Sequence, residues 1–136
     1  MRRHDWPERL HEVIAKAKKE AFAWGTHDCA LFACNCAHAM TGIDYAANFR
    51  GKYKTRKGAL TALVRIEGVK TLPELADKYL GERIALVNTQ RGDVVLLTAD
   101  SVEALGVVVG KHAVFLAPDG IQTLLLEECI CAWRVK

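Results

Sequence analysis

The chain has 136 residues, enough for one domain with a hydrophobic core and too few to expect two, so we treat residues 1–136 as a single domain. Hydrophobic residues make up 51% of the chain and charged residues 26%, which is typical of a globular protein and argues against disorder. The net charge of +3 permits an acidic partner, but there is no long run of basic residues that would indicate nucleic acid as a partner.

The N-terminus and the cysteines together indicate the cellular compartment. Two arginines follow Met1, but no apolar segment comes after them, unlike a secretory signal peptide. No stretch approaches the ~18 apolar residues of a membrane helix. We therefore expect no membrane insertion and a reducing cytosol, where the five cysteines serve as thiols, ligands or a nucleophile rather than as disulfides.

The first half of the sequence has helical periodicity. Asp5 is a candidate cap for a first helix, with Pro7 in its first turn and an apolar stripe from Leu10 to Ala17. A second helix is predicted from Thr26 or Asp28 to about Met40, ending at Gly42. This second helix is apolar on nearly every side, which is typical of a buried helix.

Shorter elements follow. Residues 43–55 predict an ordered loop, and residues 56–67 and 73–80 predict two further helices. From residue 94 the pattern changes to short strands at 94–97, 105–109, 113–116, 121–126 and 130–135, separated by turn residues. The predicted fold class is therefore α+β, with N-terminal helices packed on a small antiparallel C-terminal sheet.

Cys29 is the best candidate for a nucleophile. It stands at the start of the predicted second helix, where unpaired N–H groups and the helix dipole lower the pKa of a thiol. Cys34 and Cys36 lie further along the helix and lack that effect. The alternative interpretation is an inert thiol, because free cysteines are often buried in helices of this kind.

Six short motifs are distributed over most of the chain. They are Trp24-Gly25, Asp28-Cys29, Thr41-Gly42 with Asp44, Phe49-Arg50-Gly51 with Tyr53, Gly92-Asp93, and Ala132-Trp133-Arg134-Val135. Together they resemble the NlpC-like cell-wall peptidases of the papain-like superfamily, and most closely a subset of small phage and prophage proteins. The resemblance implies a papain-like NlpC-type fold in which the Asp-Cys pair opens a buried helix.

The resemblance leaves two registers open for the histidine that would activate the thiol. In the first, His112 begins the family's His-leading strand, and Gln122 or Thr123 orients its Nδ1. In the second, residues 104–110 match that strand, Ala104 stands at the histidine position, and the chemistry is lost. His27 is assigned a local role at the helix entry, and His38 lies about two and a half turns, ~13 Å, beyond Cys29.

The remaining cysteines form two Cys-x-Cys pairs, Cys34 with Cys36 and Cys129 with Cys131. Four thiolates can hold zinc or an iron–sulfur cluster. Positions 34 and 36 diverge by ~200° on a helix, however, so only the second pair shares a face. We assign no metal ligand and no cofactor, and keep a metal-bearing module as a third alternative. Asp93 is expected to bond turn N–H groups.

The resemblance implies a phage-tail-associated cysteine amidohydrolase that cuts peptide bonds of peptidoglycan. Cys29 would be the nucleophile, His112 the general base and Gln122 the orienting group. The partners would be the bacterial cell wall and phage tail tip or hub proteins, with no nucleic acid. The protein would stay in the host cytoplasm during assembly and then in the virion tail. The alternative is a structural tail protein that keeps the fold without the activity.

Overall fold

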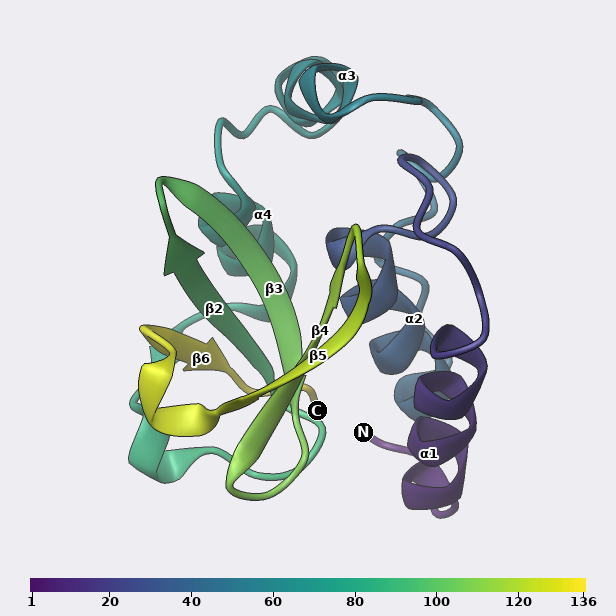
Figure 1. The fold of residues 1–136 in the computed structure, drawn as a ribbon. Coiled ribbons are helices and arrows are strands. Elements are labelled where there is room, and N and C mark those ends of the chain that lie inside the picture. Colours follow the sequence, from purple (N-terminus) through teal and green to yellow (C-terminus); the bar gives the residue numbers. More distant parts are fainter.

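Helices cover one side of an antiparallel sheet in the computed structural model, which describes residues 1–136 (Figure 1). The helical elements are α1 (Trp6–Ala17), α2 (Cys29–Thr41), α3 (Arg56–Ala62), the π-helix η1 (Leu63–Glu67), α4 (Leu72–Leu80) and the 3-10 turns η2 (Leu86–Asn88) and η3 (Leu126–Glu128). The strands are β1 (Arg83–Ile84), β2 (Val94–Ala99), β3 (Val102–Val108), β4 (His112–Ala117), β5 (Gly120–Leu125) and β6 (Cys131–Trp133). The predicted α+β class is confirmed.

The six strands form one sheet in the order β1-β6-β2-β3-β4-β5, with every neighbouring pair antiparallel. Strands β2 to β5 follow one another as hairpins. The first hairpin turns at Asp100 and Ser101, which both have positive φ, as a tight two-residue turn requires. Strand β6 departs from this order, because it returns to lie between β1 and β2.

Helix α2 is the central helix, and its bounds agree with the prediction. Asp28 is the N-cap, and its side chain accepts a hydrogen bond from the N–H of Leu31. Gly42 ends the helix in the left-handed conformation, with φ of 83°. Seven of its 13 residues are buried, on several sides of the helix. No helix in the structure combines the length and apolar character that crossing a bilayer requires.

Helix α1 begins where the sequence predicts, but Asp5 does not cap it through its side chain. The backbone of Asp5 has φ of −101° and ψ of 24°, not the extended conformation that aims a capping side chain at the first turn. Its carboxylate instead pairs with Arg9, one turn along, at 2.9 Å.

The two faces of the sheet belong to different cores, which determines which side chains can approach α2. The face towards the helices carries Leu105 and Val107 of β3 and Val114 and Leu116 of β4, packed with Phe32 of α2. The other face carries Val95, Val108, Ala113, Phe115 and Ala132, with Ala104 and Leu86 packed against them. Every second side chain of β3 and β4 therefore points away from α2.

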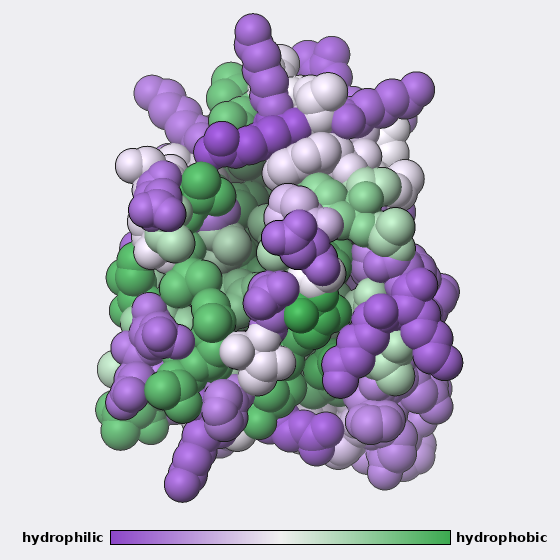
Figure 2. All heavy atoms as spheres, in the orientation of Figure 1, coloured by the Kyte–Doolittle hydropathy of each residue, from purple (hydrophilic) through white to green (hydrophobic).

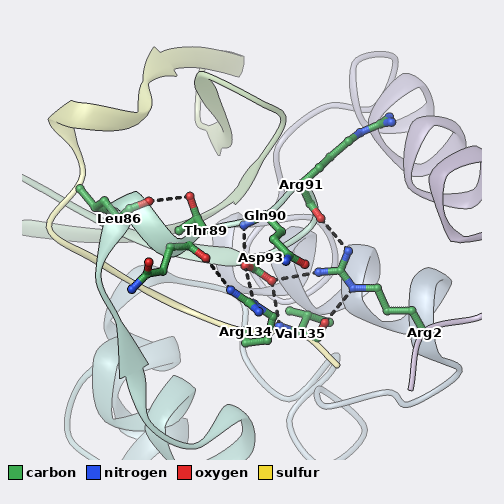
Figure 3. Close-up of polar contacts among 9 residues, drawn as sticks. Arg2, Leu86, Thr89, Gln90, Arg91, Asp93, Arg134 and Val135 are labelled. Carbon is green, nitrogen blue, oxygen red and sulfur yellow. Dashed lines mark hydrogen bonds and ion pairs between the residues drawn. The ribbon is translucent and has the colours of Figure 1, made fainter.

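Asp93 ties the two ends of the chain together (Figure 3). Its carboxylate is fully buried and accepts four hydrogen bonds: Oδ1 from Arg2 and the N–H of Val135, and Oδ2 from Arg134 and the N–H of Gln90. One donor is the turn N–H that the sequence predicts, but the two guanidinium groups come from distant segments. The carboxylate thus joins the N-terminal segment, the entrance to β2 and the segment after β6.

Candidate functional site around Cys29

The start of α2 is fixed by the buried carboxylate of Asp28, which is 1% exposed. Oδ1 accepts the N–H of Leu31 at 3.0 Å, and Oδ2 accepts the N–H of Gly25 at 2.9 Å and the hydroxyl of Tyr53 at 2.6 Å. Burial and the Asp28 carboxylate raise the pKa of Tyr53, so its hydroxyl stays a proton donor. Asp28 therefore has a structural role at the start of α2. Cys29 follows it as the first residue of the helix.

The thiol of Cys29 lies against β3 at a place where the sheet opens. Strands β3 and β4 pair only at Val107 with Val114 and at Val108 with Ala113, so they separate towards the start of β3. The backbone amide of Leu105, beyond the last pair, is near enough to the Cys29 thiol to lower its pKa.

Burial is the strongest influence on the pKa of Cys29. Burial raises the pKa of the Cys29 thiol to about 11, and the neighbouring Asp28 carboxylate also raises it. The backbone amides of Leu105 and of the first helical turn lower it, as the helix-start argument predicts, but they are the weaker influence. The net shift in this conformation is therefore upward, opposite to the lowering that the helix start alone predicts. Cys34, deeper in the helix, has its pKa raised to about 12 by burial.

Alkylation of Cys29 measures this directly. Because the thiolate is the reactive form, we expect slow reaction with iodoacetamide at neutral pH and a rate that rises about tenfold per pH unit up to pH 9. Mass spectrometry after timed quenching assigns the modified cysteine. A rate for Cys29 that levels off near pH 7 would contradict the raised pKa.

His112 does not approach Cys29 in this fold. It is the first residue of β4, is exposed, and pairs with Leu125 of β5. The β3–β4 pairing places His112 level with the end of β3, about four residues from Leu105, or roughly 13 Å along the strands. The structure therefore does not bring the proposed base to the proposed nucleophile.

Gln122 and Thr123 are also separated from His112. Gln122 pairs with Phe115, three residues along β4 from His112, and an odd separation puts the two side chains on opposite faces of the sheet. Thr123 shares a face with His112 but pairs with Val114. Neither side chain is placed to orient the imidazole of His112.

The second register places Ala104 immediately before Leu105, whose backbone amide lowers the pKa of Cys29. The side chain of Ala104 packs into the core on the far face of the sheet, with Val108 and Phe115 among that core's residues, while Leu105 faces α2. The position beside the thiol is therefore occupied by the backbone of β3 and by an aliphatic side chain.

A polar groove lies between α1 and α2 and was not predicted from the sequence. Its volume is about 480 Å³, and its polar lining includes His27, His38, Asn35, Glu20 and Arg50. The Nε2 of His27 lies 3.3 Å from the carbonyl of Ala17, which confirms its local role at the helix entry. His27 precedes α2, so the helical period of the sequence does not predict that it and His38 line one groove.

The cysteines are distributed over different parts of the core. Cys36 packs between α2 and the sheet, Cys34 packs with the segment around Phe49, and Cys129 lies on the far face of the sheet. All five are free, and no three metal-ligating side chains come together. The two Cys-x-Cys pairs therefore do not converge on one ion, which argues against the third alternative.

A comparison with protein families matches residues 1–135 to a domain of unknown function, DUF6950. The chain belongs to the DUF6950 family. A search of curated proteins finds no match. The family match covers all of the helices, the sheet and both segments bound by Asp93, so it spans the whole fold described above.

In this DUF6950 chain several of the motif residues form hydrogen bonds with one another. The carbonyl of Gly25 accepts the N–H of Gly51 at 2.8 Å, and Tyr53 donates to Asp28. Arg50 donates to Asp44 at 2.9 Å. Together with Asp93 and its arginines, these contacts give almost every motif a role in holding the fold.

Proposed function

We propose that this protein is a structural component of a phage tail tip or hub, with a papain-like NlpC-type scaffold and no peptidase chemistry. The observation that carries the proposal is the separation of the two groups: His112 begins β4 about four residues along the strands from Leu105, the β3 residue whose backbone amide influences Cys29. A cysteine hydrolase needs a base within hydrogen-bonding reach of the sulfur. The tail location rests on the resemblance of the motifs to phage and prophage proteins.

The pattern of contacts supports the structural role. Asp28, which adjoins the thiol, has both oxygens occupied by Leu31, Gly25 and Tyr53. Asp93 has both oxygens occupied by the ends of the chain. These hydrogen bonds stabilise the fold whether or not the thiol reacts. The partners of this scaffold would be neighbouring tail proteins, met in the host cytoplasm during assembly.

A cysteine amidohydrolase acting on peptidoglycan is the second candidate. One observation favours it: Cys29 is the first residue of a buried helix and is not fully enclosed. In that mechanism Cys29 attacks the peptide carbonyl, His112 accepts and returns the proton, and Gln122 orients His112. This requires β4 to slide or refold so that His112 moves roughly 13 Å along the strands to the level of Leu105.

Digestion of peptidoglycan separates the two candidates. Purified protein is incubated with sacculi, and released muropeptides are measured by liquid chromatography and mass spectrometry. We expect no release above a buffer blank, because the register of β3 and β4 keeps His112 about four residues along the strands from Leu105. Release that disappears in both Cys29→Ala and His112→Ala would replace the structural proposal with the amidohydrolase.

The structural role also predicts that the protein is present in assembled tails. Mass spectrometry of purified virions, or of a purified tail subcomplex, is expected to find the chain, and Cys29→Ala is expected to be incorporated as well as the wild type. Absence of the chain from assembled tails would refute the tail proposal even if no muropeptide is released.

A further inference from the structure

The basic residues of the chain are concentrated in one segment. Residues 50–70 contain seven of the 19 Lys and Arg but one of the 16 Asp and Glu. The rest of the chain therefore carries a small excess of negative charge, which the overall net charge of +3 conceals. The segment includes α3 and η1, which lie at one extremity of the molecule, away from the sheet (Figure 1).

Six of these cations face solvent without a partner. The six are Lys52, Lys54, Arg56, Lys57, Arg65 and Lys70, and all are exposed. None takes part in any of the eight ion pairs of the structure. The one acid of the segment, Glu67, is buried and pairs with Lys78 of α4, so it does not neutralise them. Long hydrophilic side chains accordingly project from this end of the molecule in Figure 2.

Two aliphatic side chains stand among the cations. Leu60 is 48% exposed and Val64 is 56% exposed. They are four residues apart on the continuous helical stretch of α3 and η1, so they lie on one side of it. The opposite side packs into the protein through Ala62 and Leu63. We call Leu60, Val64 and the six cations the basic tip.

We propose that the basic tip binds the surface of a bilayer with anionic headgroups. A helix that lies flat with basic residues around exposed aliphatic ones is the arrangement used by proteins that rest on membrane surfaces. The cations would meet the headgroups, and Leu60 and Val64 would enter the boundary with the acyl chains. The contact is peripheral, consistent with the lack of any helix that could span the bilayer.

The shape of the tip favours a membrane over other anionic partners. The helix projects from the body of the molecule, away from the polar groove between α1 and α2 (Figure 1). A projecting helix fits a flat, deformable surface without a matching groove. Nucleic acid would satisfy the cations but leave Leu60 and Val64 against phosphate and sugar. This inference does not depend on the tail location or on the state of Cys29.

Sedimentation with vesicles tests the proposal. The full chain is mixed with vesicles of phosphatidylcholine alone or with added phosphatidylglycerol, and the bound fraction is measured against lipid concentration and salt. We expect binding to the anionic vesicles only, weakening as salt is raised because the attraction is screened. Equal binding to both vesicles, or to neither, overturns the proposal.

Charge-reversal variants locate the contact. Lys54→Glu, Arg56→Glu and Lys57→Glu combined should weaken binding by at least roughly a hundredfold. Lys18 and Lys19 are exposed and unpaired at the end of α1, and reversing both to Glu is the control outside the tip. Leu60→Ser with Val64→Ser should also weaken binding. The weaker binding that remains would be electrostatic, and high salt should remove it. All of these positions are exposed, so unchanged thermal unfolding is expected for each variant.

Two further results would overturn the proposal. If reversal of Lys18 and Lys19 weakens binding as much as reversal in the tip, the attraction reflects total charge and not a site. If polyglutamate or duplex DNA displaces the protein from anionic vesicles at equal charge concentration, and the Leu60 and Val64 substitutions have no effect, the tip serves a polyanion instead of a bilayer.

Discussion

Replacing Asp93 with Asn is expected to lower the free energy of unfolding by about 3–5 kcal/mol, because one partner of a buried ionic network is removed. The substitution keeps the size of the side chain. Whichever oxygen becomes the amide nitrogen will face one backbone N–H and one guanidinium, since each oxygen accepts from one of each. The guanidinium groups of Arg2 and Arg134 would also lose their countercharge.

Urea unfolding followed by circular dichroism measures this change. The control is Asp119→Asn in the exposed turn between β4 and β5, which makes no side-chain hydrogen bond and should change stability by less than about 0.5 kcal/mol. Such a loss at Asp93 is a large part of the roughly 5–15 kcal/mol that stabilises a typical domain. Similar stabilities for the two variants would mean that the network does not hold the chain ends.

Substituting Gly25 with Ala is expected to destabilise the protein by about 3–5 kcal/mol. Gly25 has φ of 86°, which disfavours any side chain, and an added Cβ would lie 1.9 Å from the carbonyl oxygen of Tyr53. Relief of that clash requires the backbone at Tyr53 to move, which disturbs the hydrogen bond from its hydroxyl to Asp28.

The variant Gly68→Ala separates the clash of an added Cβ from the conformational cost of a side chain at positive φ. Gly68 also has positive φ, 72°, but nothing lies within 4 Å of the position that its Cβ would take. It should therefore show the conformational cost alone, about 1–2 kcal/mol. Because Asp28 fixes the start of α2, Gly25→Ala should also speed alkylation of Cys29, and Gly68→Ala should not. Equal unfolding free energies for the two variants would argue against the close approach at Tyr53.

Local signals predicted the individual elements well. The N-cap at Asp28 and the glycine at 42 define α2 because capping is decided by neighbouring residues. The strands at 94–97, 113–116 and 121–126 appear within one or two residues as β2, β4 and β5. Strand β1 was not predicted, since its two residues carry no periodicity and it exists through pairing with β6.

The candidate site could not be predicted in the same way, because it depends on pairing between distant segments. The sequence offers His112 and Ala104 as alternatives, and only the register of β3 against β4 shows where each lies relative to Leu105. The pKa of Cys29 likewise depends on burial by β3, which competes with the local effect of the helix start. The papain-like assignment and the role of Gln122 stay predictions.

The position of β6 has a consequence during synthesis of the chain. Residues 131–133 lie between β1 and β2, and Arg134 and Val135 supply two of the four bonds to Asp93. While the ribosome is still adding these residues, α1 and α2 and the hairpins β2 to β5 can form, but the edge of β2 stays open. The nascent chain therefore exposes an unpaired, apolar strand edge until residue 135 has left the exit tunnel, and this is the stage at which a chaperone is most useful.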